Sequence, residues 1–248
     1  ASTITAVTGA TGAMTVNAGG GGGTAITTIT ALTGAHSSYT VNMTSTSAVT
    51  MAAGGTATAI TVNATDANAH IFIADTNTAS IETYTGGSAV DTVDLGQGGD
   101  SFTSGGGADV FTIAASADTA VAVGFGHGAA VPTTAVGTTG MDIITGMTAG
   151  MTIVTGLTTA SANALIRNGG TMMSGANAAN TASALLIGTY SSAGNTFTPS
   201  NAGTDSLLVI DNNGDTAAGG LSGVVLVGYV DALQNDTMAG GTFTSVAG

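Results

Sequence analysis

The sequence predicts an all-β protein, and three features of its composition lead to that prediction. Glycine supplies 40 of the 248 residues, which favours a chain with many tight turns. Hydrophobic residues make up 43%, too many for a disordered chain, and Val and Ile recur beside Thr in short runs. Lys and Arg, which are good helix formers, total one residue. We therefore expect many short strands and no long helices.

Composition also excludes several functions. One basic residue against 14 acids gives a net charge of −13, so no basic face exists to bind nucleic acid. The absence of cysteine excludes disulfides and thiolate zinc sites. No apolar run is long enough for a transmembrane helix, so no membrane insertion is expected. The histidines at 36, 70 and 127 are scattered and no metalloprotease or P-loop motif occurs, so we expect no enzyme.

Residues 1–80 form a Thr- and Gly-rich repeat region. The run Thr3–Ala10 is echoed by Thr28–Ala35, and the tripeptide Thr-Val-Asn at 15–17 recurs at the same offset at 40–42 and once more at 61–63. Alternation of polar and apolar residues within these runs is typical of strands. Self-similarity of this kind predicts stacked β-units, in a β-solenoid or a β-sandwich.

Residues 81–118 carry a nine-residue period. In the nonapeptides 86–94, 95–103 and 104–112, the sixth place holds Asp91, Asp100 and Asp109. The eighth place holds a large apolar residue each time, namely Val93, Phe102 and Phe111. One period earlier these two places hold Glu82 and Tyr84, and one period later the sixth place holds Asp118. Three copies in strict register are a specific signal even in a Gly-rich chain.

This pattern resembles the RTX repeat, the calcium-binding nonapeptide G-G-x-G-x-D-x-U-x of proteins exported by type I secretion. The resemblance implies a short parallel β-roll, in which two nonapeptides make one turn and residues two nonapeptides apart lie above one another. Asp91 would then stack on Asp109, Glu82 on Asp100, and Asp100 on Asp118. Stacked carboxylates repel unless a cation lies between them, and oxygen ligands in a flexible turn suit Ca²⁺. Plain Asp-containing turns without metal are the alternative.

The expected calcium ligands in this segment are the carboxylates of Glu82, Asp91, Asp100, Asp109 and Asp118. Carbonyl groups of Gly96, Gly98, Gly105 and Gly107 would complete the shell, because glycine readily takes the positive-φ turns that aim them inward. Tyr84, Val93, Phe102 and Phe111 would form the stacked interior.

Residues 119–248 are expected to form a C-terminal β region. The segment 137–145 fits the nonapeptide again and places Asp142 at the sixth position, whereas Met147 and Met151 stand where the family has Phe and Asp. Apolar runs at 184–187, 207–210 and 224–227 predict strands covered on both faces. The segment 205–215 resembles the terminal strand-turn-strand of such proteins, and Asp211 and Asp215 are further candidate calcium ligands in a turn.

These features predict an extracellular structural protein at a bacterial cell surface, exported by type I secretion. Calcium would fold a self-repelling chain and leave a nearly neutral surface with unguarded strand edges, which favours self-assembly into a surface layer or filament. The expected partners are further copies, joined by strand addition through the N-terminal repeats, and a cell-surface polysaccharide anchor. The alternatives are a calcium-stabilised adhesin, an ice-binding module using Thr pairs such as 3–5 and 28–30, and the secretion domain of a larger protein.

Overall fold

The computed structural model describes most of the chain, and its regular elements are strands, as the sequence predicts. No helix in this part of the chain is long and apolar enough to cross a lipid bilayer. The described residues are 3–4, 7–19, 27–51, 59–74, 81–94, 96–113, 134–155, 165–166, 183–211, 221–231, 235–239 and 241–246.

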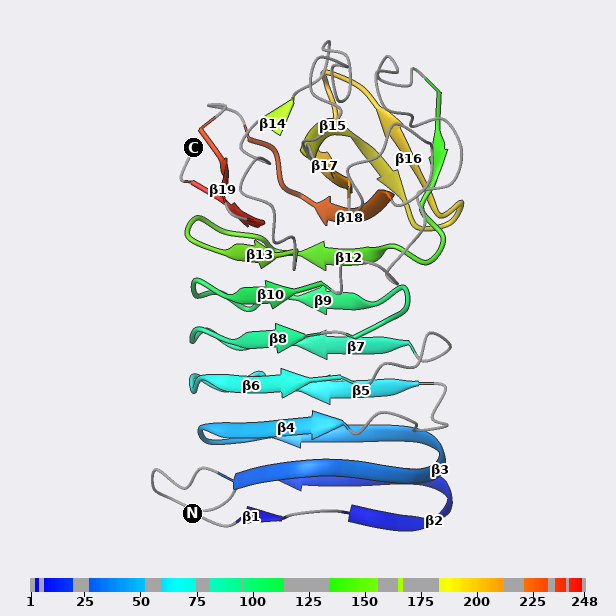
Figure 1. Ribbon diagram of the computed structural model, residues 1–248, viewed down its shortest axis with the longest axis vertical. Coiled ribbons are helices and arrows are strands. Elements are labelled where there is room, and N and C mark those ends of the chain that lie inside the picture. The colour runs from blue at the N-terminus through cyan, green and yellow to red at the C-terminus, as the bar shows by residue number, and fades with distance from the viewer. Residues whose placement is uncertain are drawn as a thin grey trace.

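Up to residue 154, most described strands pair in parallel in two columns, which lie side by side along the molecule (Figure 1). The long strand β3 bends and contributes to both columns. The first column, at the right of Figure 1, contains β2 (Val7–Ala18), β3 (Thr27–Met43), β5 (Ile60–Asn63), β7 (Glu82–Thr85), β9 (Ser101–Thr103) and β12 (Asp142–Thr145). The second column contains β1 (Thr3–Ile4), the start of β3, β4 (Ser47–Met51), β6 (His70–Ile73), β8 (Thr92–Asp94), β10 (Val110–Thr112) and β13 (Thr152–Val154).

The strand register matches the sequence repeats. Asn17 pairs with Asn42 across β2 and β3, at the offset of the repeated tripeptide, and Asn42 pairs with Asn63 across β3 and β5. Within the nonapeptide array, Thr83 pairs with Ser101, two nonapeptides later. The pairs β5–β7 and β6–β8 join the predicted segments 1–80 and 81–118 in one continuous stack.

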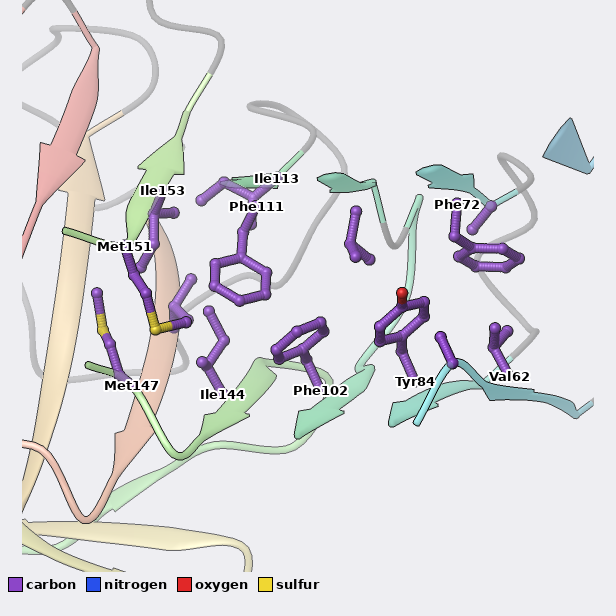
Figure 2. Close-up of a cluster of buried hydrophobic side chains, with 14 of the residues drawn as sticks. Val62, Phe72, Tyr84, Phe102, Phe111, Ile113, Ile144, Met147, Met151 and Ile153 are labelled. Atoms are coloured by element: carbon purple, nitrogen blue, oxygen red, sulfur yellow. The ribbon is translucent and has the colours of Figure 1, made fainter. Parts of the chain in front are cut away.

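The core lies between the two columns. The middle residue of each short strand points inward, and Figure 2 shows side chains of the two columns facing one another. Tyr84 and Phe102 stack with ring centroids 5.1 Å apart, and Phe111 meets Phe102 edge-on at 4.1 Å. All three rings are buried, as is Val93, so the interior predicted from the eighth place of the nonapeptide is confirmed.

The turns from the first column to the second stack on one another as closely as the strands do. A Cβ atom on Gly87 would overlap the carbonyl oxygen of Asp66 in the preceding turn. A Cβ atom on Gly105 would collide with the carbonyl oxygens of Gly86 and Gly87 in the same way. Glycine at the second place of the nonapeptide is therefore required by close backbone approach.

The C-terminal region covers the end of this stack. Strand β18 adds to β12 in parallel, and β20 adds to β13 antiparallel (Figure 1). Leu207–Ile210 and Val224–Leu226 are buried at every position, which confirms strands covered on both faces there, whereas Ile187 and Val227 of the predicted runs are only half-buried. The strands of this region are β11 (Val136–Gly137), β14 (Leu165–Ile166), β15 (Ser183–Ser191), β16 (Thr196–Pro199), β17 (Asp205–Asp211), β18 (Leu221–Val227), β19 (Thr237–Ala239) and β20 (Thr242–Thr244).

Candidate cation site

Five acids of the repeat pattern are buried in the stack, in two files that run along its length. The first acid file belongs to the first column and the second acid file to the second column. Each acid stands immediately before a strand or at its first residue, at the corner where a turn ends. The first file is Glu82, Asp100 and Asp142, and the second is Asp91 and Asp109, all at most 2% exposed.

One full turn of the stack, through both columns, is called a coil here. Each aspartate of the files, Asp91 included, accepts a hydrogen bond from the backbone of the neighbouring coil. Asp109 Oδ1 accepts the N–H of Asp91 at 2.9 Å, and Asp100 Oδ1 accepts the N–H of Glu82 at 2.8 Å. Asp142 Oδ1 accepts the N–H of Asp100 at 3.1 Å. The predicted stacking of Asp91 on Asp109 and of Glu82 on Asp100 is therefore present, with the carboxylates aligned along the stack.

The second carboxylate oxygens of Asp91 and Asp109 differ. Asp109 Oδ2 accepts the hydroxyl of Ser104 at 2.8 Å, at the first place of its own nonapeptide. Gly86 holds that place in the turn of Asp91 and has no hydroxyl to offer. The Asp91 carboxylate lies instead against the Tyr84 hydroxyl and the backbone N–H of Gly87, and its buried Oδ2 has no partner as well aligned as Ser104 is for Asp109. A buried carboxylate oxygen with only poorly aligned donors is costly, and a positive group nearby would reduce that cost.

Burial also governs the ionisation of these groups. Loss of water raises the pKa of Asp91, and the hydrogen bonds from the His70 N–H, the Tyr84 hydroxyl and the Gly87 N–H offset only part of that effect. Loss of water likewise raises the pKa of Asp109. Burial raises the pKa of Tyr84, and the nearby charge of Asp91 raises it further, which places the phenol beside this carboxylate. The second file is therefore destabilised when charged and would gain from a cation.

The glycines of the array partly follow the prediction. Gly96, Gly98 and Gly107 have φ of 83°, 142° and 92°, as expected for turns that only glycine forms readily. The positive φ expected at Gly105 is wrong, because Gly106 takes it instead, at 133°. Gly105 is needed for the close backbone approach described above. The nonapeptide pattern tolerates this exchange because both places carry glycine.

Asp118, Asp215 and the side chain of Asp211 lie outside the described residues, so their predicted roles remain predictions. The expected stacking of Asp100 on Asp118 is wrong. Ser101 pairs with Ile143, so the level next to Asp100 is held by Asp142. The physical reason is that the nonapeptide pattern lapses after residue 113 and resumes only at 137–145.

Two residues of this region were missed from the sequence. His70, judged there a scattered histidine, occupies the level before Asp91 in the second column, and its N–H donates to Asp91 Oδ1 at 3.0 Å. Asp66 accepts from the imidazole Nε2 of His70 at 2.9 Å. His70 and Asp91 are further apart in the chain than two nonapeptides, so the nine-residue period could not align them.

The donor set fits Ca²⁺ better than a smaller ion. No group of three or more Asp, Glu, His or Cys side chains gathers closely enough within the described ranges to hold a metal by itself. An ion between two turns would therefore take carboxylate oxygen from Asp91 or Asp109 and complete its shell with turn carbonyls. Ca²⁺ accepts such irregular shells of six to eight oxygens, whereas Mg²⁺ requires a regular octahedron.

Comparison with known proteins adds no relative. A scan against models of known protein families finds no match to the chain, and a search of curated proteins finds none of significant similarity. Inference about function therefore depends on the geometry of the acid files.

Proposed function

We propose that this chain is an extracellular structural protein whose parallel stack folds when Ca²⁺ binds along the acid files. The observation that carries the proposal is the alignment of five buried carboxylates in a chain with one Lys or Arg residue. Basic side chains are too few to neutralise them. Burying an ionised carboxylate is costly even when it accepts hydrogen bonds, so a divalent cation is the most direct counter-charge.

Binding of Ca²⁺ would also agree with an extracellular location. Extracellular calcium modules bind with dissociation constants of about 10⁻⁴ to 10⁻³ M, which the ion exceeds only outside the cytoplasm. The chain would stay under-folded during export and fold on arrival. This behaviour agrees with the resemblance of residues 86–112 to RTX repeats and with type I secretion.

Self-assembly into a surface layer or filament is the second part of the proposal. The chain carries 6% charged residues, and the segment 1–65 contains no Asp, Glu, Lys or Arg. Protein surfaces normally resist association through charge, especially on strand edges. Calcium would cancel much of the remaining −13, so folding and association would respond to the same ion.

A calcium titration of the metal-free chain tests this proposal. Each site occupied at 100-fold excess over its dissociation constant stabilises the fold by about 2.7 kcal/mol. That stabilisation raises the unfolding temperature by on the order of 5–10 °C for a chain of this length. Equal concentrations of Mg²⁺ serve as the matched control and should have little effect. An unfolding temperature that Ca²⁺ leaves unchanged would refute calcium-dependent folding, and monomers in electron micrographs under both conditions would refute assembly.

Ice binding is a second candidate function that one observation favours. The outer face of the first column carries an uncharged file of Thr15, Thr40, Thr61 and Thr83 beside a file of asparagines. The hydroxyls recur at the strand spacing of about 4.8 Å, a regular array that suits a regular lattice. The Thr pairs singled out from the sequence, at 3–5 and 28–30, lie where side chains are not described. Thermal hysteresis in dilute calcium-loaded protein, lost in Thr61→Lys, would favour ice binding over assembly.

A further inference from the structure

His70 occupies the place of an acid in the second column. Ser47 pairs with His70 across β4 and β6, and the pairing of Ile71 with Thr92 sets His70 beside Asp91. The His70 N–H donates to Asp91 Oδ1 as the Asp91 N–H donates to Asp109 Oδ1. The backbone ladder therefore continues through His70, and only the side chain differs.

The imidazole of His70 is held at both nitrogens. It is 1% exposed, with Nδ1 2.9 Å from Ser47 Oγ and Nε2 2.9 Å from Asp66 Oδ1. A carboxylate only accepts, so Nε2 donates to Asp66. Asp66 is fixed in turn by the backbone N–H groups of Ser45 and Asn68, both at 2.8 Å. The imidazole ring is therefore held in one orientation by side chains on two successive coils, those of Ser47 and Asp66.

The turn that carries Asp66 is also longer than those of the acid coils. Residues 64–70 separate Asn63 from Ile71, whereas only residues 86–91 separate their register partners Thr85 and Thr92. The longer turn still contacts the next one closely, since Gly87 lies against the carbonyl of Asp66. At this level an imidazole held by two hydrogen bonds therefore stands where the acid coils have a carboxylate, and the adjoining turns are in close backbone contact.

We propose that His70, held by Ser47 and Asp66, ends the cation file of the second column and marks the boundary of calcium-dependent folding. No Ca²⁺ binds between the turns 64–69 and 86–90, and the coils before His70 are held by side-chain hydrogen bonds instead. His70 thereby limits the number of Ca²⁺ ions that the stack can bind. This inference rests on the proposed binding of Ca²⁺ along the acid files.

Ion stoichiometry tests the proposal. His70→Asp restores a carboxylate next to Asp91 and Asp66, and it should bind one more Ca²⁺ per chain than the wild type in equilibrium dialysis. His70→Asn is the matched control, since it removes the imidazole without adding charge and should leave the count unchanged. Equal counts for the wild type and a folded His70→Asp chain would overturn the inference alone. A wild-type chain that binds no Ca²⁺ would overturn the proposed function as well.

Hydrogen exchange of the wild-type chain provides a test that does not depend on a variant. In EGTA, backbone amides of Val41 and Val62 should stay protected while those of Val93 and Phe111 exchange quickly. Excess Ca²⁺ should restore protection of the second pair. Uniform loss of protection in EGTA on both sides of His70 would contradict a boundary at this residue.

Discussion

Two regions of the stack solve the same geometric problem with different chemistry. In the coils before His70, Asn42 donates to Asn17 at 2.8 Å and Asn63 donates to Asn42 at 2.9 Å, so neutral side chains link successive coils. In the nonapeptide coils, buried carboxylates link successive coils through backbone N–H groups. Amide ladders carry no net charge, whereas each buried carboxylate adds a charge that needs compensation. Parallel register can therefore be held by either chemistry, and of the two regions only the acid coils create a need for a cation.

Removal of the aromatic core in the nonapeptide coils should have the largest effect of any single substitution in Ca²⁺, the condition in which these coils are folded. Phe102→Ala deletes the ring between Tyr84 and Phe111 and should lower the free energy of unfolding by about 3–5 kcal/mol. Thr103→Ala, an exposed neighbour, should change it by less than about 0.5 kcal/mol. Urea denaturation measures both. An equal loss for Phe102→Ala in EGTA would show that the nonapeptide coils fold without calcium.

Asp91→Asn should separate charge from hydrogen bonding in the acid coils. The amide keeps an acceptor oxygen for the His70 N–H but removes the buried charge, so the variant should unfold at a higher temperature than the wild type in EGTA. In excess Ca²⁺ it should lose the stabilisation of one site, about 2.7 kcal/mol at 100-fold saturation. Thermal unfolding in both conditions measures the two effects.

The control for this substitution is Asp205→Asn. Asp205 is a buried acid outside the files, and its two oxygens accept the N–H groups of Tyr190 and Gly228 at 2.7 and 2.8 Å. This variant should be destabilised equally with and without Ca²⁺. If Asp91→Asn behaves as Asp205→Asn does, the acid files have no special relation to calcium.

Asn42→Ala should lower the free energy of unfolding of the coils before His70, by less than the substitutions above. Loss of its two side-chain hydrogen bonds should cost about 1–2 kcal/mol, with the same value in EGTA and in Ca²⁺. Thr61→Ala, on the same outer face, should cost less than about 0.5 kcal/mol. A calcium-dependent loss in Asn42→Ala would mean that the ion file extends beyond His70.

The pH dependence of the metal-free chain should be modest in size but unusual in sign. Because burial raises the pKa of Asp91 and Asp109 above the ordinary value of 3.8, the folded chain holds protons that the unfolded chain releases. Stability in EGTA should therefore fall as pH rises from about 4 towards 7. Excess Ca²⁺ should reverse this slope, since the ion binds the charged form. Urea denaturation across this range in both conditions checks the sign, and a stability in EGTA that rises with pH would contradict it.

Asp66 gives folding stability the opposite dependence on pH, in a lower pH range. Burial alone would raise its pKa, but hydrogen bonds from Asn68, His70 and Ser45 outweigh that effect and lower it to about 2. Its stabilisation is complete above about pH 4 and disappears as pH falls towards 2. Asp66→Asn should remove this loss of folding stability below about pH 4, as urea denaturation at low pH would show. An unchanged loss would show that the hydrogen bonds between Asp66 and His70 do not stabilise the fold.

Much of this architecture was predictable from periodicity. A nine-residue repeat defines which side chains share a file, so the stacking of Asp91 on Asp109 and the burial of the apolar side chain at each eighth place followed directly. The recurring Thr-Val-Asn tripeptide likewise predicted stacked units, in which Asn17 pairs with Asn42. These inferences needed only the alternation of inward and outward residues along a strand.

The remaining features depend on insertions, which a fixed period does not detect. The chain is longer between Ile73 and Thr83 than between their register partners Asp94 and Ser101, and this difference hides the alignment of His70 with Asp91. The lapse of the pattern after residue 113 hides the alignment of Asp142 with Asp100 in the same way. To predict which side chains meet across neighbouring coils, the strand register must be known before the residue types can be compared.

The contrast between Gly86 and Ser104 at the first place of the nonapeptide also could not be interpreted from the sequence. Both residues are common in turns, so neither stands out in a repeat of this composition. The difference matters only because Ser104 donates to Asp109 Oδ2, whereas Asp91 receives no hydroxyl from the first place of its own nonapeptide and lies against Tyr84 instead.

Terbium luminescence tests the central claim most directly, because Tb³⁺ substitutes for Ca²⁺ and emits when an excited tyrosine lies nearby. Tyr84 is buried beside Asp91, whereas Tyr190 lies in the C-terminal region on β15. We predict strong sensitised emission that excess Ca²⁺ quenches, that Tyr84→Phe abolishes and that Tyr190→Phe preserves. Emission that is absent, or that Tyr84→Phe leaves intact, would contradict a cation bound along the acid files.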